Sequence, residues 1–367
     1  MNKKIRIIGA LCLAVLWLGL TAFAWLRTPG DISEAERRPL SQFPTLNGET
    51  ILNGKFMSEF EKYTLDQFPL RDPFRQVKSL FHYYALGQKD NNDIYIADGY
   101  AAKLEYPLNE AAVEKALEKF NLIYENNLKN TGSKIYTAII PDKGYYLGEE
   151  NDYPVMDYEK LYAMVQAGMP WSEHVDIRYE LSAKDYYFTD THWRQEKLLP
   201  VAQKLCRAMG VTAPKAEDFT KTKVEKPFYG VYYGQAALPM AAEELFVMES
   251  DLLRDCTVYS YDLKADTAVY NMEKLTSRDL YDVFLSGPQS LLEIKNPNAK
   301  TDKELIVFRD SFGSSLVPLL VQDYAKVTVV DIRYLPSSAV GQFVEFTGQD
   351  VLFAYSTLIL NTGSALK

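Results

Sequence analysis

The sequence contains few of the residues on which common enzyme chemistries depend. Among its 367 residues there are three cysteines and three histidines. Three cysteines are too few for a disulfide scaffold, and they lack the spacing of a zinc site. The patterns G-x-x-x-x-G-K-[ST], G-x-G-x-x-G, C-x-x-C and H-E-x-x-H do not occur, so no phosphate cradle or metal motif is predicted. We expect an activity that uses no metal and no other cofactor.

Positive charge is also scarce. Lysine and arginine number 40 against 49 aspartates and glutamates, which gives a net charge of −9. A nucleic-acid binder needs a basic face to neutralise phosphates, so we expect no nucleic-acid partner. Hydrophobic residues make up 47% and charged residues 24% of the chain. These ordinary globular values argue against a wholly disordered chain and against a polytopic membrane protein.

One long uncharged stretch stands at the amino terminus. Three basic residues precede a run from Ile7 to Leu26 without a charged side chain. A helix of this length, at about 1.5 Å per residue, spans a hydrocarbon core of roughly 30 Å. A long signal peptide has the same pattern, and Ala22-Phe23-Ala24 is compatible with cleavage. We predict that residues 1–27 are a signal anchor or a signal peptide, with the body of the protein exported in either case.

The rest of the chain falls into two segments. Residues 28–100 are predicted to be a connector with two helical stretches, over 56–65 and 74–84, separated by Pro69. Residues 101–367 alternate amphipathic and apolar runs: a helix over 109–130, strands over 134–140, 304–308, 326–332 and 350–355, and a helix from Gly313. Apolar strands that alternate with helices predict a mainly parallel sheet covered by helices.

Two segments carry residues suited to nucleophilic catalysis. In the first, Asp190 precedes His192 by two residues, and in an extended segment both side chains project to the same side. Asp190 could then hold one imidazole nitrogen while the other acts as a base. The alternative is a histidine that only makes local hydrogen bonds.

In the second segment, Ser311 follows an apolar strand and opens a helix. A hydroxyl presented by such a turn is well placed as a nucleophile, with free N–H groups nearby for an oxyanion. The alternative is a helix N-cap, for which serine and aspartate are favoured on structural grounds. Together the two segments supply an acid, a base and a nucleophile in the order Asp–His–Ser, which is compatible with convergent triads.

These residues resemble a known family. Asp190-Thr191-His192-Trp193 is similar to the DHHW motif of a family of exported bacterial proteins, and to the D-x-H-W of the alginate O-acetylation proteins. Further segments resemble blocks of the same family in the same order: Ile32–Pro44, Asp66-Gln67-Phe68-Pro69-Leu70-Arg71-Asp72, Pro227-Phe228-Tyr229-Gly230, Asp282-Val283-Phe284-Leu285, Asp310-Ser311-Phe312-Gly313 and Asp331-Ile332-Arg333-Tyr334. The resemblance thus runs from about residue 30 to the end.

The resemblance implies an SGNH-hydrolase-like, flavodoxin-like α/β/α fold in which Asp190, His192 and Ser311 form the triad. Three features depart from the family pattern. Thr191 replaces the second-position histidine, as in the alginate type, and Arg309 stands where SGNH enzymes usually have glycine. The G-x-N-D block that supplies an oxyanion amide is missing, and Leu285-Ser286-Gly287-Pro288 lies where relatives carry Gly-Asn.

The resemblance also implies a function: a membrane-anchored, extracytoplasmic O-acetyltransferase or esterase acting on a cell-surface polysaccharide. The expected partners are that polysaccharide, the membrane and a separate membrane-spanning protein that delivers acetyl groups. Arg333 and Trp193 are candidates for substrate contact, and Asp310 for the substrate or oxyanion region. A salt bridge is the alternative for Arg333, and core packing is the alternative for Trp193. A non-catalytic polysaccharide-binding or assembly factor on the same fold is the alternative function.

Overall fold

The computed structural model describes residues 3–363 and 365–367. They form two compact units. The first contains the chain up to Asn92 together with Tyr233–Pro239, and the second contains Asp93–Tyr232 and Met240–Lys367. The segment Tyr233–Pro239 of the first unit therefore interrupts the second unit once in sequence. The second unit holds the candidate catalytic residues.

The first unit begins with the helix predicted from the uncharged stretch. Helix α1 covers Lys3–Leu26, its most apolar window has a mean hydropathy of 2.3, and none of that window is buried. The helix is long and apolar enough to cross a membrane. The other elements of the first unit are the following: β1 (Ile32–Ser33), β2 (Arg38–Pro39), α2 (Gly48–Leu52), α3 (Lys55–Asp66), α4 (Arg71–Leu80), the π-helical turn η1 (Phe81–Ala85) and β3 (Asp90–Asn91). Helices α3 and α4 confirm the two helical stretches predicted on either side of Pro69.

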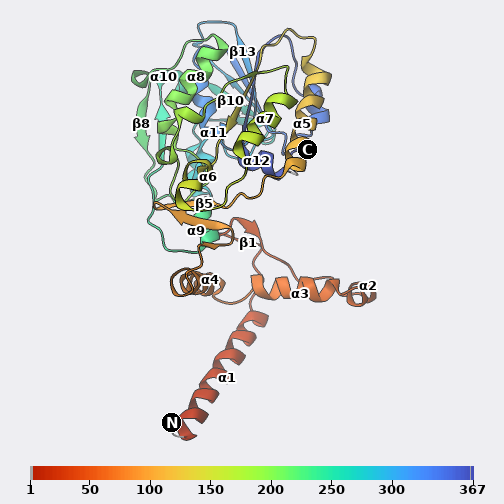
Figure 1. The fold of residues 1–367 in the computed structure, drawn as a ribbon, viewed down its shortest axis with the longest axis vertical. Helices are drawn as coiled ribbons and strands as arrows, with labels where there is room; N and C mark the ends of the chain where they lie inside the picture. The colour runs from red at the N-terminus through yellow and green to blue at the C-terminus, as the bar shows by residue number, and fades with distance from the viewer. Residues whose placement is uncertain (1–2, 364) are drawn as a thin grey trace. The chain divides into compact units, whose positions relative to one another are not determined.

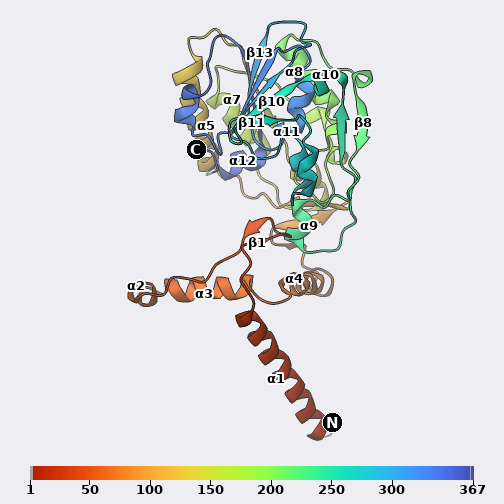
Figure 2. The same ribbon diagram turned by 180° about the vertical axis from the view of Figure 1, so that it is seen from behind.

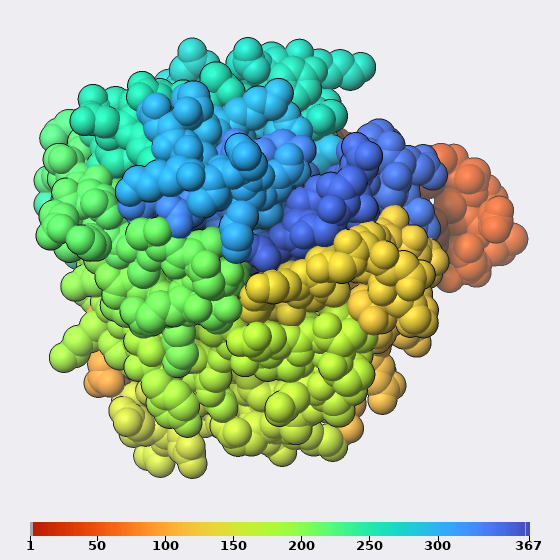
Figure 3. Space-filling view, turned by 90° about the horizontal axis from the view of Figure 1, so that it is seen from above, coloured from red at the N-terminus to blue at the C-terminus, as the bar shows by residue number. Residues whose placement is uncertain are grey.

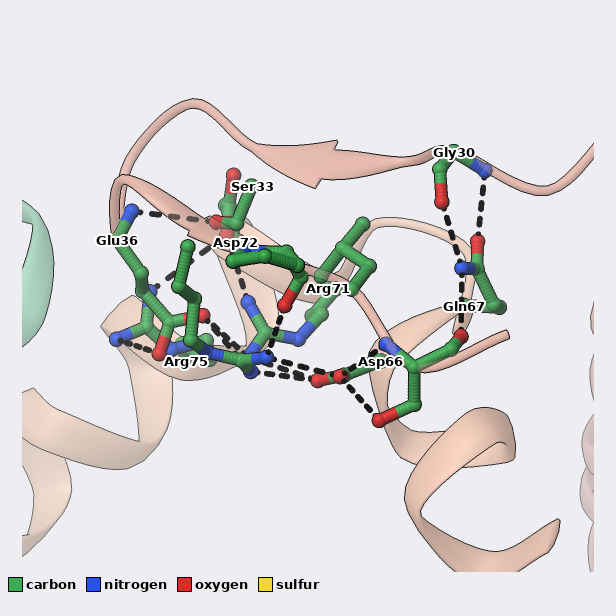
Figure 4. Close-up of polar contacts among 12 residues, drawn as sticks. Gly30, Ser33, Glu36, Asp66, Gln67, Arg71, Asp72 and Arg75 are labelled. Atoms are coloured by element: carbon green, nitrogen blue, oxygen red, sulfur yellow. Dashed lines mark hydrogen bonds and ion pairs between the residues drawn. The ribbon is translucent and has the colours of Figure 1, made fainter. Parts of the chain in front are cut away.

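An ion-pair cluster around the buried Asp66 carboxylate and the partly buried Glu36 connects the elements of the first unit (Figure 4). The Asp66 carboxylate, at the end of α3, accepts hydrogen bonds from Arg38 at 2.6 and 2.9 Å and from the Ser41 N–H at 2.9 Å. Glu36 forms ion pairs with Arg71 at 2.5 Å and with Arg75 at 3.2 Å. Because the arginines come from β2 and α4, the cluster fixes α3 and α4 to the β1–β2 hairpin.

The second unit is built on an eight-stranded sheet with the order β11-β10-β12-β14-β13-β15-β6-β7. Strands β14, β13, β15, β6 and β7 run parallel, and β11, β10 and β12 continue the sheet in antiparallel pairs. The strands are β6 (Ile135–Ile140), β7 (Glu173–His174), β10 (Thr257–Ser260), β11 (Ala265–Thr267), β12 (Leu291–Lys295), β13 (Glu304–Arg309), β14 (Lys326–Val330) and β15 (Asp350–Ser356). Two further antiparallel pairs are the hairpin of β4 (Ile94–Ala97) with β5 (Tyr100–Lys103), and β8 (Thr220–Lys223) with β9 (Phe246–Glu249), which are joined by a longer segment that contains α9.

Helices cover both faces of this sheet (Figures 1 and 2). The bounds are α5 (Glu110–Ile123), α6 (Lys143–Leu147), α7 (Tyr158–Gly168), α8 (Leu199–Met209), α9 (Val231–Ala236), α10 (Asp251–Asp255), α11 (Gly313–Leu316) and α12 (Thr357–Thr362). Alternate side chains of β13 enter two separate cores: Leu305 and Val307 pack with α8 and α11, whereas Ile306 and Phe308 pack with α5, α7 and α12. The predicted three-layer, SGNH-hydrolase-like α/β/α fold with a mainly parallel sheet is confirmed.

The carboxyl-terminal segment closes one of these cores. In Figure 3, residues near the end of the chain (blue) lie directly beside the segment that contains α5 (yellow), which agrees with the contacts between α12 and α5. Two details differ from the predictions. The predicted helix over 109–130 ends as a π-helical turn, η2 (Tyr124–Leu128), and the helix from Gly313 continues as a 3₁₀ helix, η10 (Val317–Leu320). Pro318 in the second of these segments lacks the N–H that a regular α-helix requires.

The ion-pair cluster of the first unit predicts a difference between two aspartates that both contact Arg71. Asp66 is buried and accepts several hydrogen bonds, whereas Asp72 is half exposed and contacts Arg71 at 3.5 Å. We expect Asp66→Asn to lower the free energy of unfolding by about 1–3 kcal/mol. Asp72→Asn should change it by less than about 0.5 kcal/mol. Urea unfolding of the full chain, followed by hydrogen exchange of residues 30–80, measures both.

The same substitution has a defined pH dependence. The hydrogen-bonded Arg38 guanidinium holds the pKa of Asp66 well below its usual value. The stabilisation by Asp66 is therefore fully present above the unfolded-state pKa of about 3.9, and is lost as the pH falls through the lower folded-state pKa. The difference between wild type and Asp66→Asn should shrink in that acidic range. An equal difference across it would contradict the assignment.

Candidate active site

The nucleophile candidate stands out by its exposure. From Leu305 to Val321 every residue is buried except Ser311, which is partly exposed. Ser311 is the second residue after the carboxyl end of β13, which lies between the parallel strands β14 and β15. In open α/β sheets ligands bind outside the carboxyl ends of the strands, so this is the edge at which a site is expected.

The turn around Ser311 is fixed by the carboxylate of Asp310. Its Oδ1 accepts the Phe312 N–H at 3.0 Å and its Oδ2 accepts the Ser356 N–H at 2.8 Å, which ties the turn to the end of β15. A Cβ at Gly313 would lie 2.6 Å from the Arg309 Cβ, so only glycine permits this close return of the chain. Asp310 is thus fully buried and positions the serine turn.

The N-cap alternative does not describe Ser311. Helix α11 begins at Gly313, its N-cap residue is Phe312, and no side chain caps it. The Ser311 hydroxyl instead lies 2.8 Å from Nε2 of His192. Residues 119 positions apart in sequence are therefore brought into hydrogen-bonding contact.

The second nitrogen of His192 contacts Asp190. Nδ1 lies 2.5 Å from Oδ1 of Asp190, and the same oxygen accepts the His192 backbone N–H at 3.0 Å. An ionised carboxylate can only accept, so Nδ1 carries the hydrogen and Nε2 of the neutral ring is free to accept the Ser311 proton. Asp190, His192 and Ser311 thus have the connectivity of a serine triad.

The local backbone is not the extended segment that we predicted. Residues 187–192 form a loop, closed by a bridge between Tyr186 and Trp193 and by the Tyr187 N–H, which donates to the His192 carbonyl at 3.1 Å. Asp190 meets the imidazole because its side chain also accepts the N–H two residues on, as in an Asx turn. The contact between Asp190 and His192 agrees with the prediction, but the extended backbone from which it was predicted is not present.

The Pro227–Gly230 block orients Asp190 from the other side. The Val231 N–H donates to Oδ2 of Asp190 at 2.8 Å, and the Gly230 N–H donates to the Thr189 hydroxyl at 2.9 Å. A Cβ on Gly230 would lie 2.3 Å from the Cα of Asp190. The sequence showed this block only as a resemblance, and its role as a cradle for Asp190 was not predicted.

Two buried charged residues hold the backbone of the same loop. Glu243 accepts the N–H groups of Phe188 and Thr189 at 2.5 and 2.7 Å, and the Lys143 ammonium donates to the Tyr187 carbonyl at 2.8 Å. Burial raises the pKa of Glu243 and lowers the pKa of Lys143, and each charge favours the other. Glu243 binds backbone N–H groups of the loop and Lys143 binds a backbone carbonyl of the loop. We therefore interpret both as residues that position the loop.

Aromatic rings enclose the imidazole. Tyr281, in the 3₁₀ helix η9 (Leu280–Val283), stacks on the His192 ring with centroids 3.9 Å apart, and Phe312 packs at 4.9 Å. Trp193 is completely buried, and its indole N–H donates to the Phe312 carbonyl at 3.0 Å. No sugar ring can stack on it, so the packing interpretation of Trp193 is the correct one. The stacking role of Tyr281 had no signal in the sequence.

The arginines near the site are bound to a shared carboxylate. Asp331 accepts from Arg333 at 2.6 and 2.9 Å and from the buried Arg309 at 3.1 Å. Arg333 is therefore in the salt bridge that was the alternative to substrate contact. Burial lowers the pKa of Arg309, whose Nε and Nη2 have no hydrogen-bond partner among the described residues. A glycine at position 309, as in the usual pattern, could not make this link between β13 and β14.

One backbone donor is available for an oxyanion. In the turn 311–314, the N–H groups of Phe312, Gly313 and Ser314 have acceptors, whereas the Ser311 N–H has none among the described residues.

The stretch after η9 is buried and has three successive positive φ angles, 51° at Leu285, 64° at Ser286 and 76° at Gly287. The Ser286 hydroxyl is bonded to Thr267 and Asn271.

The remaining candidates lie elsewhere. His82 is in the first unit, and His174 contacts Ser172 and the Met169 carbonyl. Cys206 and Cys256 are both buried and free, and they form no disulfide with each other. Within residues 3–363 and 365–367, no three or more His, Cys, Asp or Glu side chains are grouped as metal ligands would be.

The chain is similar to known proteins in both sequence and fold. The model of the DHHW protein family matches residues 175–330, a range that includes all three triad positions. This match confirms the predicted resemblance to the DHHW family. No curated protein matches the chain significantly by sequence.

Solved structures align with the chain, and those with a TM-score above 0.5 share its fold. A DHHW family protein from Eubacterium siraeum aligns with a TM-score of 0.56 at 20% identity, over 76% of this chain and 93% of that one. Bacillus cereus PatB1 with a sulfonyl adduct aligns with a TM-score of 0.56 at 16% identity, over 74% and 95%. The O-acetyltransferase domain of Pseudomonas putida AlgJ aligns with a TM-score of 0.45 at 16% identity, over 73% and 92%. At these identities the likeness concerns the fold.

The geometry around Asp190 predicts an effect of Gly230→Ala. The added methyl group would collide with the Asp190 backbone and displace its carboxylate from His192. We expect the proton NMR signal of the His192 Nδ1–H to be shifted or lost. Gly48→Ala is the matched control, because a Cβ there meets nothing within 4 Å. An unchanged imidazole signal in Gly230→Ala would contradict the assigned role of this glycine.

Proposed function

We propose that this protein is a serine-dependent O-acyltransferase or esterase, with an acetyl group as the transferred acyl group. The observation that supports this most directly is the connected series Asp190–His192–Ser311, with distances of 2.5 and 2.8 Å. Its hydroxyl end is the one partly exposed position in an otherwise buried run. The alternative interpretation, in which His192 makes only local hydrogen bonds, does not account for the contact between its Nε2 and the distant, partly exposed Ser311.

The geometry supports an acyl-enzyme mechanism. Ser311 Oγ attacks the acyl carbonyl carbon while its proton passes to Nε2 of His192, and the Ser311 N–H donates to the oxyanion. Asp190 holds the ring and stabilises the imidazolium. When the tetrahedral intermediate collapses, the bond to the leaving group breaks and His192 returns the proton to it. A hydroxyl of the acceptor then attacks the acyl carbon and His192 takes its proton. When this second tetrahedral intermediate collapses, the bond to Ser311 Oγ breaks and His192 returns the proton to that oxygen, which frees the enzyme.

The acceptor that we propose is a cell-surface polysaccharide. The DHHW match and the resemblance of Asp190-Thr191-His192-Trp193 to the alginate O-acetylation proteins support this class of acceptor. A sugar hydroxyl gives transfer and water gives hydrolysis, and the chemistry at Ser311 is the same in both.

The cellular setting that we propose is the outer face of the cell membrane. Helix α1 would be a single-pass anchor, and the body of the protein would be extracytoplasmic, or secreted if α1 is removed as a signal peptide. Acetyl donors made in the cytoplasm would have to cross the membrane, and a single span does not transport them. A separate membrane-spanning protein that delivers acetyl groups is therefore part of the proposal. Deletion of such a protein should abolish O-acetylation of the surface polysaccharide.

The catalytic assignment predicts a loss of activity in Ser311→Ala. With p-nitrophenyl acetate as the acyl donor, this variant of the full-length protein in detergent should be slower than wild type by about 10³-fold or more. Asp190→Asn should lose about 10²–10⁴-fold, since the imidazole loses the acceptor that fixes its tautomer. Ser133→Ala, at a serine just before β6, is the control and should retain the wild-type rate.

The outcome that would contradict catalysis is equal, near-background rates for wild type and Ser311→Ala. A non-catalytic polysaccharide-binding or assembly factor would give that result. Circular dichroism of each variant shows whether a loss of rate comes from unfolding.

A further inference from the structure

Helix α4 and the η1 turn that continues it carry an apolar face that nothing in the structure covers. Leu70 is the N-cap residue of α4, Phe74 and Val77 lie within α4, and Phe81 and Tyr84 lie in η1. These residues are spaced at i, i+4, i+7, i+11 and i+14, close to the repeat of an apolar helix face. Each of these side chains is between 50% and 72% exposed. We call these five residues the α4 stripe. At 1.5 Å per residue the stripe is about 21 Å long.

The orientation of the stripe is fixed by the other face of α4. Arg71 and Arg75 bind Glu36 in the ion-pair cluster of Figure 4. The Arg75 guanidinium also donates to the Gly234 carbonyl at 3.0 Å, and the buried Ser79 hydroxyl accepts from Asn91 at 2.7 Å. Since these contacts hold the polar face inward, the stripe cannot rotate into the first unit without breaking them.

The first unit exposes many other large hydrophobic side chains besides the stripe. The described residues include 14 exposed large hydrophobic side chains within 27–92, and 11 within the much longer segment 93–367. Among the former, Leu46, Leu52 and Met57 lie in or beside α2 and α3, and all are more than 60% exposed. Monomeric soluble proteins rarely expose large apolar patches, so this surface indicates an interaction.

Its connection to α1 identifies the occupant. Thr21, Ala24 and Trp25, in the last turns of α1, line one cavity together with Tyr63 and Thr64 of α3. In the first unit, α3 and α4 lie crosswise to α1 (Figure 1). If α1 crosses the bilayer, it leaves the hydrocarbon at about Leu26, and the helices attached at that point lie at the level of the lipid headgroups. Aromatic and aliphatic residues on one face, with basic residues such as Lys78 beside them, are typical of helices that lie in this layer.

We propose that the α4 stripe lies in the interfacial layer of the same membrane that α1 enters, so that the protein contacts the bilayer through a spanning helix and a surface-bound helix. This inference rests on the membrane anchoring in the proposed function. In this arrangement α4 lies in the headgroup layer of the bilayer, whereas α1 passes through its hydrocarbon core. A bilayer is a continuous apolar partner, which suits a stripe that continues over four turns.

The test is spin labelling of the full-length protein in vesicles of phosphatidylcholine and phosphatidylglycerol. The background variant is Cys12→Ser, since Cys206 and Cys256 are buried. Labels are placed at Val77→Cys or Phe81→Cys in the stripe, and at Lys115→Cys on the exposed side of α5 as the aqueous control. A separate sample labelled at the native Cys12 reports on α1. Accessibility to oxygen, which partitions into lipid, is compared with accessibility to a water-soluble nickel chelate. Near-ultraviolet circular dichroism confirms that each variant is folded.

The expected result is a several-fold higher ratio of oxygen to nickel accessibility at positions 77 and 81 than at position 115, with a still higher ratio at Cys12. If Cys12 is in lipid but positions 77 and 81 match position 115, the stripe is in water and the inference is overturned, while the anchor stands. If the stripe labels are shielded from both reagents, protein covers the stripe, either a second copy or a partner, and the inference is again overturned. If Cys12 matches position 115, the anchoring itself fails, and this outcome is distinct from the other two.

Discussion

The structure of the candidate site depends on one buried carboxylate. Asp190 accepts three hydrogen bonds: from the His192 backbone N–H, from the His192 ring and from the Val231 N–H. The first of these sets the turn of the loop, the second sets the tautomer of the imidazole, and the third ties the loop to the start of α9. Because a buried carboxylate without donors is costly, these bonds hold the side chain in one position. His192 is consequently placed with Nε2 toward Ser311.

The other half of the site is set by the sheet. Parallel strands end at a common edge, and polar side chains follow the strands there: Asp310 directly after β13, Asp331 directly after β14, Thr357 directly after β15 and Asp142 two residues after β6. Asp310 connects the serine turn to Ser356, Asp331 binds Arg309 and Arg333, and Asp142 accepts from Thr357. These links are made by side chains that follow different strands, so each strand end is fixed relative to its neighbours. The rigidity of Ser311 follows from this cross-linking, since its own hydroxyl contacts only His192 among the described residues.

Much of the fold was predictable because its signals are local. The apolar runs that became β6, β13, β14 and β15 are buried on both faces, and such runs are visible in sequence without knowledge of their partners. The sequence also indicated Asp190, His192 and Ser311 as a candidate triad, from the D-x-H pair and from a serine after a strand, and the structure brings these three side chains into contact. The loop that carries Asp190 was predicted wrongly as extended, since its shape depends on Glu243 and Gly230, which are distant in sequence. Tyr281 and Lys143 were missed for the same reason: stacking on an imidazole and donation to a loop carbonyl leave no pattern along the chain.

The central claim is that Ser311 forms a covalent acyl-enzyme. The most direct measurement is mass spectrometry of the peptide that contains Ser311, after the full-length protein has reacted briefly with an activated acetyl ester and been quenched in acid. We expect one added acetyl group on Ser311 of the wild-type protein, and none on that residue when His192 is replaced by alanine. An unmodified Ser311 in a wild-type sample that still turns over the ester, or an acetyl group on another residue as the reactive intermediate, would contradict it.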